Sequence, residues 1–432
     1  MKQSPWWWDS VPRTPRPADN SVGATLALPT DIDVLVVGAG FTGLTTAMTL
    51  ARAGRSVAVL EKEAAGYGAS TRNGGMIGSG HRVAFTEVAR QYGEDVAEAV
   101  LGEGKLGLSY TTDLIEEENI ECDFVRCGRF RGAWRAQDYD AIAREADILR
   151  AKLGVPIEMV AKADVHKEVA TDAYHGGCVY LEHGGLHPAK LHHGLLRIAR
   201  DAGAGVFEQT EVLRIRHDET KYVVETTRGV IRAGEIVMAT NGYTTAAAPQ
   251  MKRSLIPIAS YMIATEPLGR DIVDALFPSK RMIVETRSRH CYYRPSPDGE
   301  RILLGARAAL NHINTARSGL ILKDLLTGIL PQLGDVKISH SWLGTLGFTK
   351  DHLPRIGRDN DGVFYAMGYS GSGVAMAPYL GWRVANKVLG RAEGNTGFDP
   401  MDFPRVAFHP FIPLGLPFVN LWYRWKDIVE GS

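Results

Sequence analysis

The sequence predicts an α/β fold with two domains, and three observations support this prediction. The chain has 432 residues, which is more than one compact core usually serves. Residues 34–37 form an apolar run that leads into a glycine-rich turn, a helix and a second apolar run at 57–60, as in a parallel β–α–β unit. Residues 256–308 instead alternate and contain a Ser-Pro-Asp-Gly turn, which indicates antiparallel strands. We therefore expect a Rossmann-like domain and a second α+β domain built on a mostly antiparallel sheet.

The glycine-rich turn matches the dinucleotide-binding fingerprint. Gly38 permits the tight turn, Gly40 lets the backbone approach a pyrophosphate, and Gly43 lets the helix pack closely on the strand. Free N–H groups at the helix N-terminus attract phosphate. The second strand ends at Glu61, which can accept hydrogen bonds from a ribose diol. An ordinary glycine-rich turn is the alternative. The residues assigned to this part of the site are Gly38, Ala39, Gly40, Phe41, Thr42, Gly43, Glu61 and Lys62.

The segment after this acid indicates a longer cofactor than NAD. Residues 67–75, YGASTRNGG, are small, polar and rich in glycine, where a simple NAD enzyme would continue into regular structure. Such a loop can place Ser70 and Arg72 near phosphates and residues 73–75 against a flat ring. The residues assigned here are Gly68, Ala69, Ser70, Thr71, Arg72, Asn73, Gly74, Gly75 and Met76.

The GASTRNGG motif at this place resembles that of the FAD-dependent amine and amino-acid oxidases of the D-amino acid oxidase superfamily, especially its gamma-glutamylputrescine oxidase branch. The resemblance extends from Trp6 to Asp427. It implies a glutathione-reductase-like FAD-binding domain and oxidation of a C–N bond in a primary or secondary amine or amino acid, with a gamma-glutamylputrescine-like substrate as one case. In that reaction a hydride passes to the flavin, the imine hydrolyses, and dioxygen reoxidises the flavin to give hydrogen peroxide.

The resemblance also implies further cofactor residues, and this sequence differs from its relatives at two places that bear on the flavin. The further residues are Val212, Thr240, Asn241, Gly242, Gly344, Gly371, Ser372, Gly373 and Val374. Relatives that bind flavin covalently use a cysteine where Gly344 stands, so we expect non-covalent FAD. Relatives also place an oxygen-activating lysine in the strand that matches residues 301–307, which here holds Leu303 and Leu304. A dehydrogenase that uses a quinone or protein acceptor is therefore an alternative, and a non-catalytic flavoprotein subunit is another.

The expected domain division is discontinuous. An N-terminal arm covers residues 1–30, the FAD-binding domain 31–80, 181–250 and 335–395, the substrate domain 81–180 and 251–334, and a C-terminal tail 396–432. Helices are expected at 87–119 (two helices), 136–153, 188–203 and 315–332, and strands at 124–134, 205–215, 222–226, 230–233, 235–240 and 363–366.

Substrate-cavity candidates come from position alone. Strand alternation puts His290, Tyr292 and Arg294 on one face, and Tyr369 stands beside a cofactor segment. An arginine there could hold a substrate carboxylate. The alternative is that the tyrosines belong to the core and the charges to the rim. His81 and Arg82 are weaker candidates, and no Ser/His/Asp or paired-carboxylate constellation is found.

Composition excludes several other classes of function. Lys plus Arg and Asp plus Glu both count 49, so nothing favours nucleic acid as a partner. No apolar run reaches the length of a membrane span, the start lacks a secretory leader, and membrane contact by the aromatic tail is not expected.

The cysteines have no metal or redox spacing, which favours the cytoplasm. No metal is expected, because Gly184, Gly185 and Pro188 separate the histidines near residue 187. Residues 6–8, three tryptophans, should pack on the body of the protein.

Overall fold

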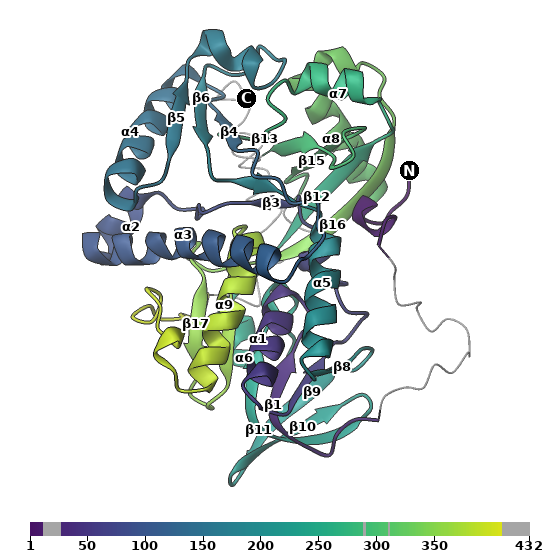
Figure 1. The fold of residues 1–432 in the computed structure, drawn as a ribbon, viewed down its shortest axis with the longest axis vertical. Helices are drawn as coiled ribbons and strands as arrows, with labels where there is room; N and C mark the ends of the chain where they lie inside the picture. The colour runs from purple at the N-terminus through teal and green to yellow at the C-terminus, as the bar shows by residue number, and fades with distance from the viewer. Residues whose placement is uncertain (12–26, 288–290, 310–311, 408–432) are drawn as a thin grey trace.

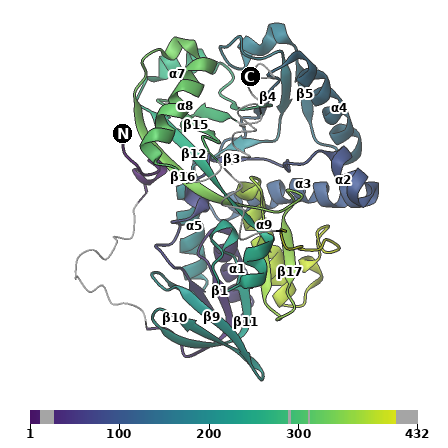
Figure 2. The same cartoon turned by 180° about the vertical axis from the view of Figure 1, so that it is seen from behind.

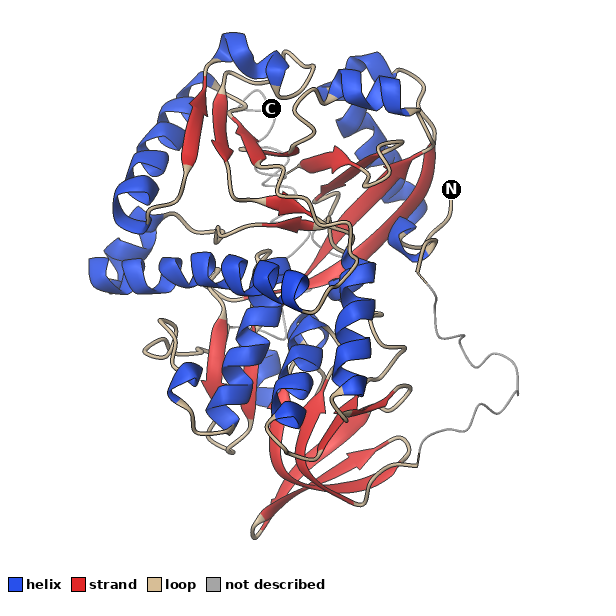
Figure 3. Cartoon of the chain, viewed as in Figure 1, coloured by secondary structure: helices blue, strands red, loops and turns tan. Residues whose placement is uncertain are grey.

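Two eight-stranded sheets organise the molecule, one in each half (Figures 1 and 3). The structure is a computed structural model, and it describes residues 1–11, 27–287, 291–309 and 312–407. His290, most of the tail and residues 12–26 of the arm lie outside these ranges. Within them, no helix combines the length and the apolarity that crossing a bilayer demands. The predicted fold class is confirmed.

The first sheet contains the predicted β–α–β unit. Its strands are β1 (Asp31–Val37), β2 (Val57–Leu60), β8 (Gly205–Phe207), β9 (Val212–Asp218), β10 (Lys221–Thr226), β11 (Gly229–Met238), β17 (Arg355–Arg358) and β18 (Phe364–Met367). Strands β2, β1, β11 and β18 run parallel. The predicted strand at 205–215 is instead two strands: β8 extends the parallel sheet beside β2, and β9 pairs antiparallel with β10.

Helices α1 (Phe41–Arg52), α5 (Pro188–Asp201) and α9 (Gly373–Val388) cover one face of this sheet (Figure 2). Alternation along β1 explains the two-sided packing. Val34 and Val36 join the core with these helices, whereas Leu35 and Val37 join the core beneath β9 and β10. A strand buried on both faces reads as a continuous apolar run, as the sequence shows at 34–37.

The second sheet is mostly antiparallel, as predicted. Its strands follow the order β16 (Ile338–Phe348), β12 (Ile256–Thr265), β15 (Ile302–Ala306), β14 (Tyr292–Pro295), β13 (Met282–Glu285), β4 (Arg129–Gly132), β6 (Gly177–Tyr180) and β5 (Ile157–Val160). Only β13 and β4 pair in parallel among these neighbours. Helices α7 (Arg270–Leu276) and α8 (Thr315–Ile329) share a core with the central strands, and α4 (Ala136–Leu153) packs on β5 and β6. The bounds predicted for α4 are confirmed.

Two segments pack differently from the expected domain division. The pair α2 (Phe85–Tyr92) and α3 (Glu94–Glu117) crosses the middle of the molecule (Figure 1). Leu108 and Ile115 of α3 share one core with α1 and α9, because these apolar side chains of α3 face the helices that cover the first sheet. Conversely β16, expected in the FAD domain, pairs with β12 along nearly its whole length. We therefore propose the same discontinuous division with two changes. The α2–α3 pair is assigned to the domain of the first sheet, and β16 is assigned to the domain of the second sheet. The remaining elements are α6 (Pro249–Ser254), β3 (Met76–Ile77) and β7 (Gly184–Gly185).

Candidate functional site

A first cavity of about 310 Å³ opens where β1 and β2 end and α1 begins. Gly38 adopts a φ of +105° in the turn. A side-chain carbon on Gly43 would lie 1.9 Å from the Gly38 carbonyl oxygen, so only glycine lets α1 sit this close to the strand. The first N–H groups of α1 have no partner one turn earlier, although Phe41 donates to Ser70 Oγ at 3.0 Å. The turn therefore offers backbone donors and a positive helix end at the cavity wall.

Glu61 closes the opposite side of the turn. Its carboxylate accepts hydrogen bonds from the backbone N–H of Ala39 at 2.9 Å and of Glu63 at 3.0 Å. Burial raises the pKa of this carboxyl above its usual value despite both bonds. The carboxylate lines the first cavity, where each oxygen keeps a second lone pair for a ligand hydroxyl.

His192 supports the same turn from α5. Its Nε2 lies 2.7 Å from the Ala39 carbonyl oxygen, and because a carbonyl only accepts, the histidine donates. Burial lowers the pKa of His192 to about 4, so the ring is neutral at physiological pH. His183 accepts from the Ser79 backbone N–H at 3.1 Å, and His187 caps α5 by accepting from the Lys190 N–H at 3.2 Å. Each of these three histidines has at least one protein partner, and the described residues form no cluster of three metal-ligand side chains.

A second cavity of about 150 Å³ adjoins the first along the predicted flavin loop. Ala69, Asn73 and Gly371 line both cavities. Gly74 is required here, because a side-chain carbon would come within 2.7 Å of the Tyr292 ring. A third cavity of about 830 Å³ continues from the second, and Arg82, Arg129 and Arg307 line both.

The predicted cofactor residues divide among these cavities. Those lining the first are Gly38, Ala39, Gly40, Phe41, Thr42, Glu61, Lys62, Gly68, Ala69, Ser70, Asn73, Val212, Thr240, Asn241, Gly371, Gly373 and Val374. Arg72, Gly74, Met76 and Gly344 line the second, and Ser372 lines the third. Gly43, Thr71, Gly75 and Gly242 line none of the three cavities. Sequence reasoning missed Tyr67 and Tyr243, which line the first cavity, although Tyr67 begins the loop motif and Tyr243 directly follows the predicted cofactor residues 240–242.

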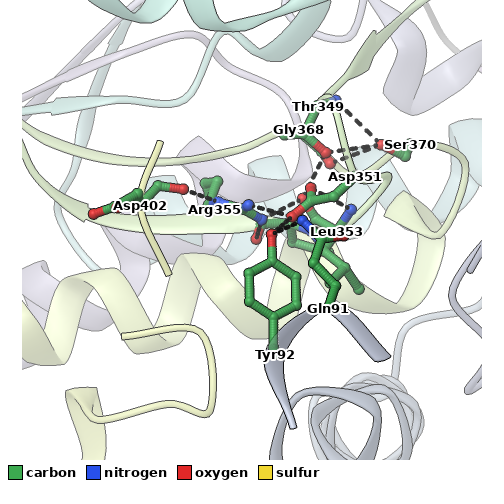
Figure 4. A network of polar contacts seen from close by, with 10 residues as sticks. Gln91, Tyr92, Thr349, Asp351, Leu353, Arg355, Gly368, Ser370 and Asp402 are labelled. Carbon is green, nitrogen blue, oxygen red and sulfur yellow. Dashed lines mark hydrogen bonds and ion pairs between the residues drawn. The ribbon is translucent and has the colours of Figure 1, made fainter. Parts of the chain in front are cut away.

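A buried polar network fixes the turn before α9 (Figure 4). Asp351 pairs with Arg355 at 2.5 Å and accepts from the Tyr92 hydroxyl at 2.8 Å. Ser370, with a φ of +51°, donates through its hydroxyl to the Gly368 carbonyl at 3.1 Å. The Thr349 N–H donates to the same hydroxyl at 3.4 Å. The network therefore holds the positive end of α9 at the first two cavities, which residues 371 and 374 line.

The substrate candidates prove to have different surroundings. Tyr292 lines the second cavity. Arg294 lines none of the three cavities, contrary to expectation. Its guanidinium instead donates to the carbonyls of Gly75 at 2.6 Å and Leu186 at 3.1 Å, because the far end of β14 lies behind the flavin loop. Tyr369 belongs to the first cavity, and its hydroxyl lies 2.6 Å from Thr42 Oγ1.

Arg129 lines the third cavity and was not predicted from the sequence. It stands on β4, and its Nε has no hydrogen-bond partner within the described structure. The acids of that cavity are already engaged: Glu285 with Arg287, Asp138 with Arg135, and Glu145 with a backbone N–H. A basic residue in a strand carries no sequence signal for such a role, because only the sheet order brings β4 to the cavity.

The arrangement fits FAD. Two helix N-termini, an acid at the end of β2 and a glycine-bounded loop line one continuous pair of cavities, and a dinucleotide carrying a flat ring system needs these features. None of the four cysteines, all free, lines any of the three cavities, and Gly344 lines the second. Non-covalent attachment stays a prediction.

Comparisons with known proteins agree with this geometry. The family model "DAO: FAD dependent oxidoreductase" matches residues 33–387. The chain is 31% identical to the probable oxidoreductase OrdL of Rhizobium meliloti over 91% of this chain and 92% of that one. It is 29% identical to the gamma-glutamylputrescine oxidoreductase of Escherichia coli, over 90% and 92% of the two chains. The crystal structure of glycine oxidase from Geobacillus kaustophilus superposes with a TM-score of 0.72 at 23% identity, covering 88% and 99% of the two chains.

Proposed function

Because the chain belongs to the DAO family of FAD-dependent oxidoreductases, we propose that it oxidises the C–N bond of an amine or amino acid that also carries an anionic group. The observation that supports the anionic group is the charge of the third cavity. Arg82, Arg129 and Arg307 line it where it joins the second cavity, and its acids are paired with other protein groups. An amine with a carboxylate, such as gamma-glutamylputrescine, has the required chemistry.

One set of residues binds the cofactor, and another residue binds the substrate. The α1 and α9 turns and Glu61 would hold FAD, which when bound would accept a hydride from the carbon that carries the amine nitrogen. Arg129, whose buried Nε has no hydrogen-bond partner among the described residues, binds the substrate anion. A charge-assisted bond in such a site is stronger than one in water, so it fixes which end of the amine reaches the second cavity. Tyr292, Ser260 and Phe348 form part of the second cavity's wall and limit access of water to it.

Two electron acceptors remain distinguishable by experiment. We favour dioxygen, with hydrogen peroxide as product, following the resemblance of the whole chain. A quinone or protein acceptor is the second candidate, because Leu303 and Leu304 are fully buried in the sheet and no lysine is among the described residues that line the second cavity. We also assign the protein to the cytoplasm, since its four cysteines are unpaired and a reducing compartment keeps them so.

The first experiment compares putrescine with gamma-glutamylputrescine, which differ by the acyl group that carries a carboxylate. Each is added without air to the yellow holoenzyme, and the flavin absorbance is followed. Bleaching by the acylated amine alone supports the proposal. Equal bleaching by both refutes recognition of an anion. A holoenzyme that stays yellow with these amines, glycine and a panel of D- and L-amino acids refutes amine oxidation and favours a non-catalytic subunit. Readmission of air, or addition of a quinone, then identifies the acceptor.

A variant tests the role of Arg129. Replacing it by Gln should raise KM for the anionic substrate by about ten- to a hundredfold, the value of one charge-assisted hydrogen bond. Lys105→Gln is the control, because Lys105 lines the third cavity but is exposed and donates to the Gly154 carbonyl at 3.3 Å. Similar KM values for Arg129→Gln and wild type would remove Arg129 from the site.

A further inference from the structure

The first residues of the chain are attached to the second sheet, far from β1 in the other half of the molecule (Figure 1). The Lys2 N–H donates to the Ser339 carbonyl at 2.8 Å, and the Ser341 N–H donates to the Lys2 carbonyl at 2.9 Å. Asp9 accepts from Lys2 Nζ at 2.7 Å and pairs with His340 Nε2 at 3.1 Å. Residues 2–10, called the N-terminal clasp below, are thus anchored to β16 near both ends.

Between these anchors, two indoles reach the cofactor loop, residues 68–75. Trp7 is fully buried, and its Nε1 donates to the Asn73 carbonyl at 2.8 Å. The Nε1 of Trp8 donates to Thr71 Oγ1 at 2.8 Å. From β16, Trp342 donates to the Arg72 carbonyl at 3.0 Å. Three consecutive residues of the loop, 71 to 73, are therefore each held by a tryptophan.

Arg72 is held by rings rather than by an acid. Its guanidinium lies 4.5 Å from the ring centre of Trp8 and 4.5 Å from that of Tyr67. It also donates to the carbonyls of Tyr67 at 2.6 Å and Leu343 at 3.1 Å. A cation between two aromatic faces is stabilised by both. Removing Trp8 would therefore leave Arg72, which lines the second cavity beside Asn73, with only one of its two aromatic partners.

We propose that the N-terminal clasp is a positioning device for FAD: it holds the cofactor loop in its binding shape, so that FAD affinity depends on residues 2–10. The loop contains three glycines, and ordering such a segment costs conformational entropy. The clasp orders it before the cofactor arrives, which removes that cost from binding. By linkage, FAD must stabilise the docked clasp by the same factor. The inference rests on FAD binding and not on the identity of the amine.

The test measures FAD affinity of the apoprotein by quenching of flavin fluorescence. Trp7→Phe and Trp8→Phe keep an aromatic ring but lose the indole N–H, and each should raise the Kd for FAD by about two- to tenfold. Removal of residues 2–10 should raise it more than either. The matched control is Trp6→Phe, because Trp6 contacts Trp7 and His187 through its ring alone and should leave the Kd within about twofold.

Hydrogen exchange provides the reciprocal readout in the full-length protein. The amides of Trp8 and Asp9 donate to the Pro5 and Trp6 carbonyls, and their exchange should slow when FAD is added. A purely structural role would lower thermal stability of the apoprotein without changing the Kd or the exchange. The proposal would be overturned by unchanged Kd values for FAD in both single variants. It would also be overturned by amide exchange rates at residues 8 and 9 that stay the same when FAD is added. Failure of every amine substrate would leave it intact.

Discussion

Replacing Gly43 by Ala should separate the cofactor turn from α1. The added carbon would stand 1.9 Å from the Gly38 carbonyl oxygen and 3.3 Å from Val36 Cγ1. Non-bonded atoms need about 3.5 Å, so the helix and the turn must move apart by about 1.5 Å. The obstacle is backbone, which no rotamer change can remove. Gly38 also lines the first cavity, so the shift alters the FAD site itself.

The magnitude follows from the kind of clash. Overpacking of a core costs about 1–3 kcal/mol and occasionally more, and a clash with rigid backbone belongs at the upper end. About 3 kcal/mol of lost binding free energy corresponds to a Kd for FAD about a hundredfold higher. Gly40→Ala should be milder, about tenfold, because its added carbon meets the Ser70 side-chain oxygen at 2.9 Å and that oxygen can rotate away. Rotation forfeits only the bond from the Phe41 N–H.

The assay titrates apoprotein with FAD and, separately, measures urea unfolding of the apoprotein. Gly54→Ala is the matched control, since Gly54 follows α1 with a φ of +81° and no atom of the described residues lies within 4 Å of the added carbon. It should cost about 1 kcal/mol of unfolding free energy and leave FAD affinity unchanged. The reasoning is refuted if Gly43→Ala binds FAD within about threefold of wild type, or if Gly54→Ala weakens FAD binding as much.

Two further predictions concern buried groups away from the substrate. Arg294→Ala should lower the unfolding free energy by about 2–4 kcal/mol and weaken FAD binding, because the Leu186 carbonyl loses its guanidinium donor and the Gly75 carbonyl keeps only the Leu186 N–H; a change in KM alone, with stability intact, would contradict this. Burial lowers the pKa of His187 and of His192 to about 4, below the value of 6.5 in an unfolded chain. Their contribution to stability is therefore complete above pH 6.5 and is lost as the pH falls toward 4, by about 2 kcal/mol each at pH 5. Urea midpoints at pH 7.5 and pH 5 should differ less in His187→Gln and His192→Gln than in wild type; equal pH dependence in all three proteins would exclude these rings as the cause.

The sequence by itself determined the features that are local in the chain. The turn at Gly38, Gly40 and Gly43, the acid at Glu61 and the helix at 136–153 follow from spacing, apolar period and turn chemistry within stretches of about thirty residues. Each of these needs only neighbours along the chain to form. The family resemblance added FAD and the C–N oxidation class, since the loop motif is specific in its combination.

Only the tertiary structure decided which distant residues meet. Arg294 and Gly75 are 219 positions apart, and strand alternation predicts the face of Arg294 but not which loop lies beyond it. Arg129 reaches the third cavity because β4 pairs with β13, a partnership between strands that no local pattern encodes. Trp7 likewise meets Asn73 from 66 positions away. Packing between elements depends on the shape of both surfaces at once, so a single stretch of sequence carries only half of the information.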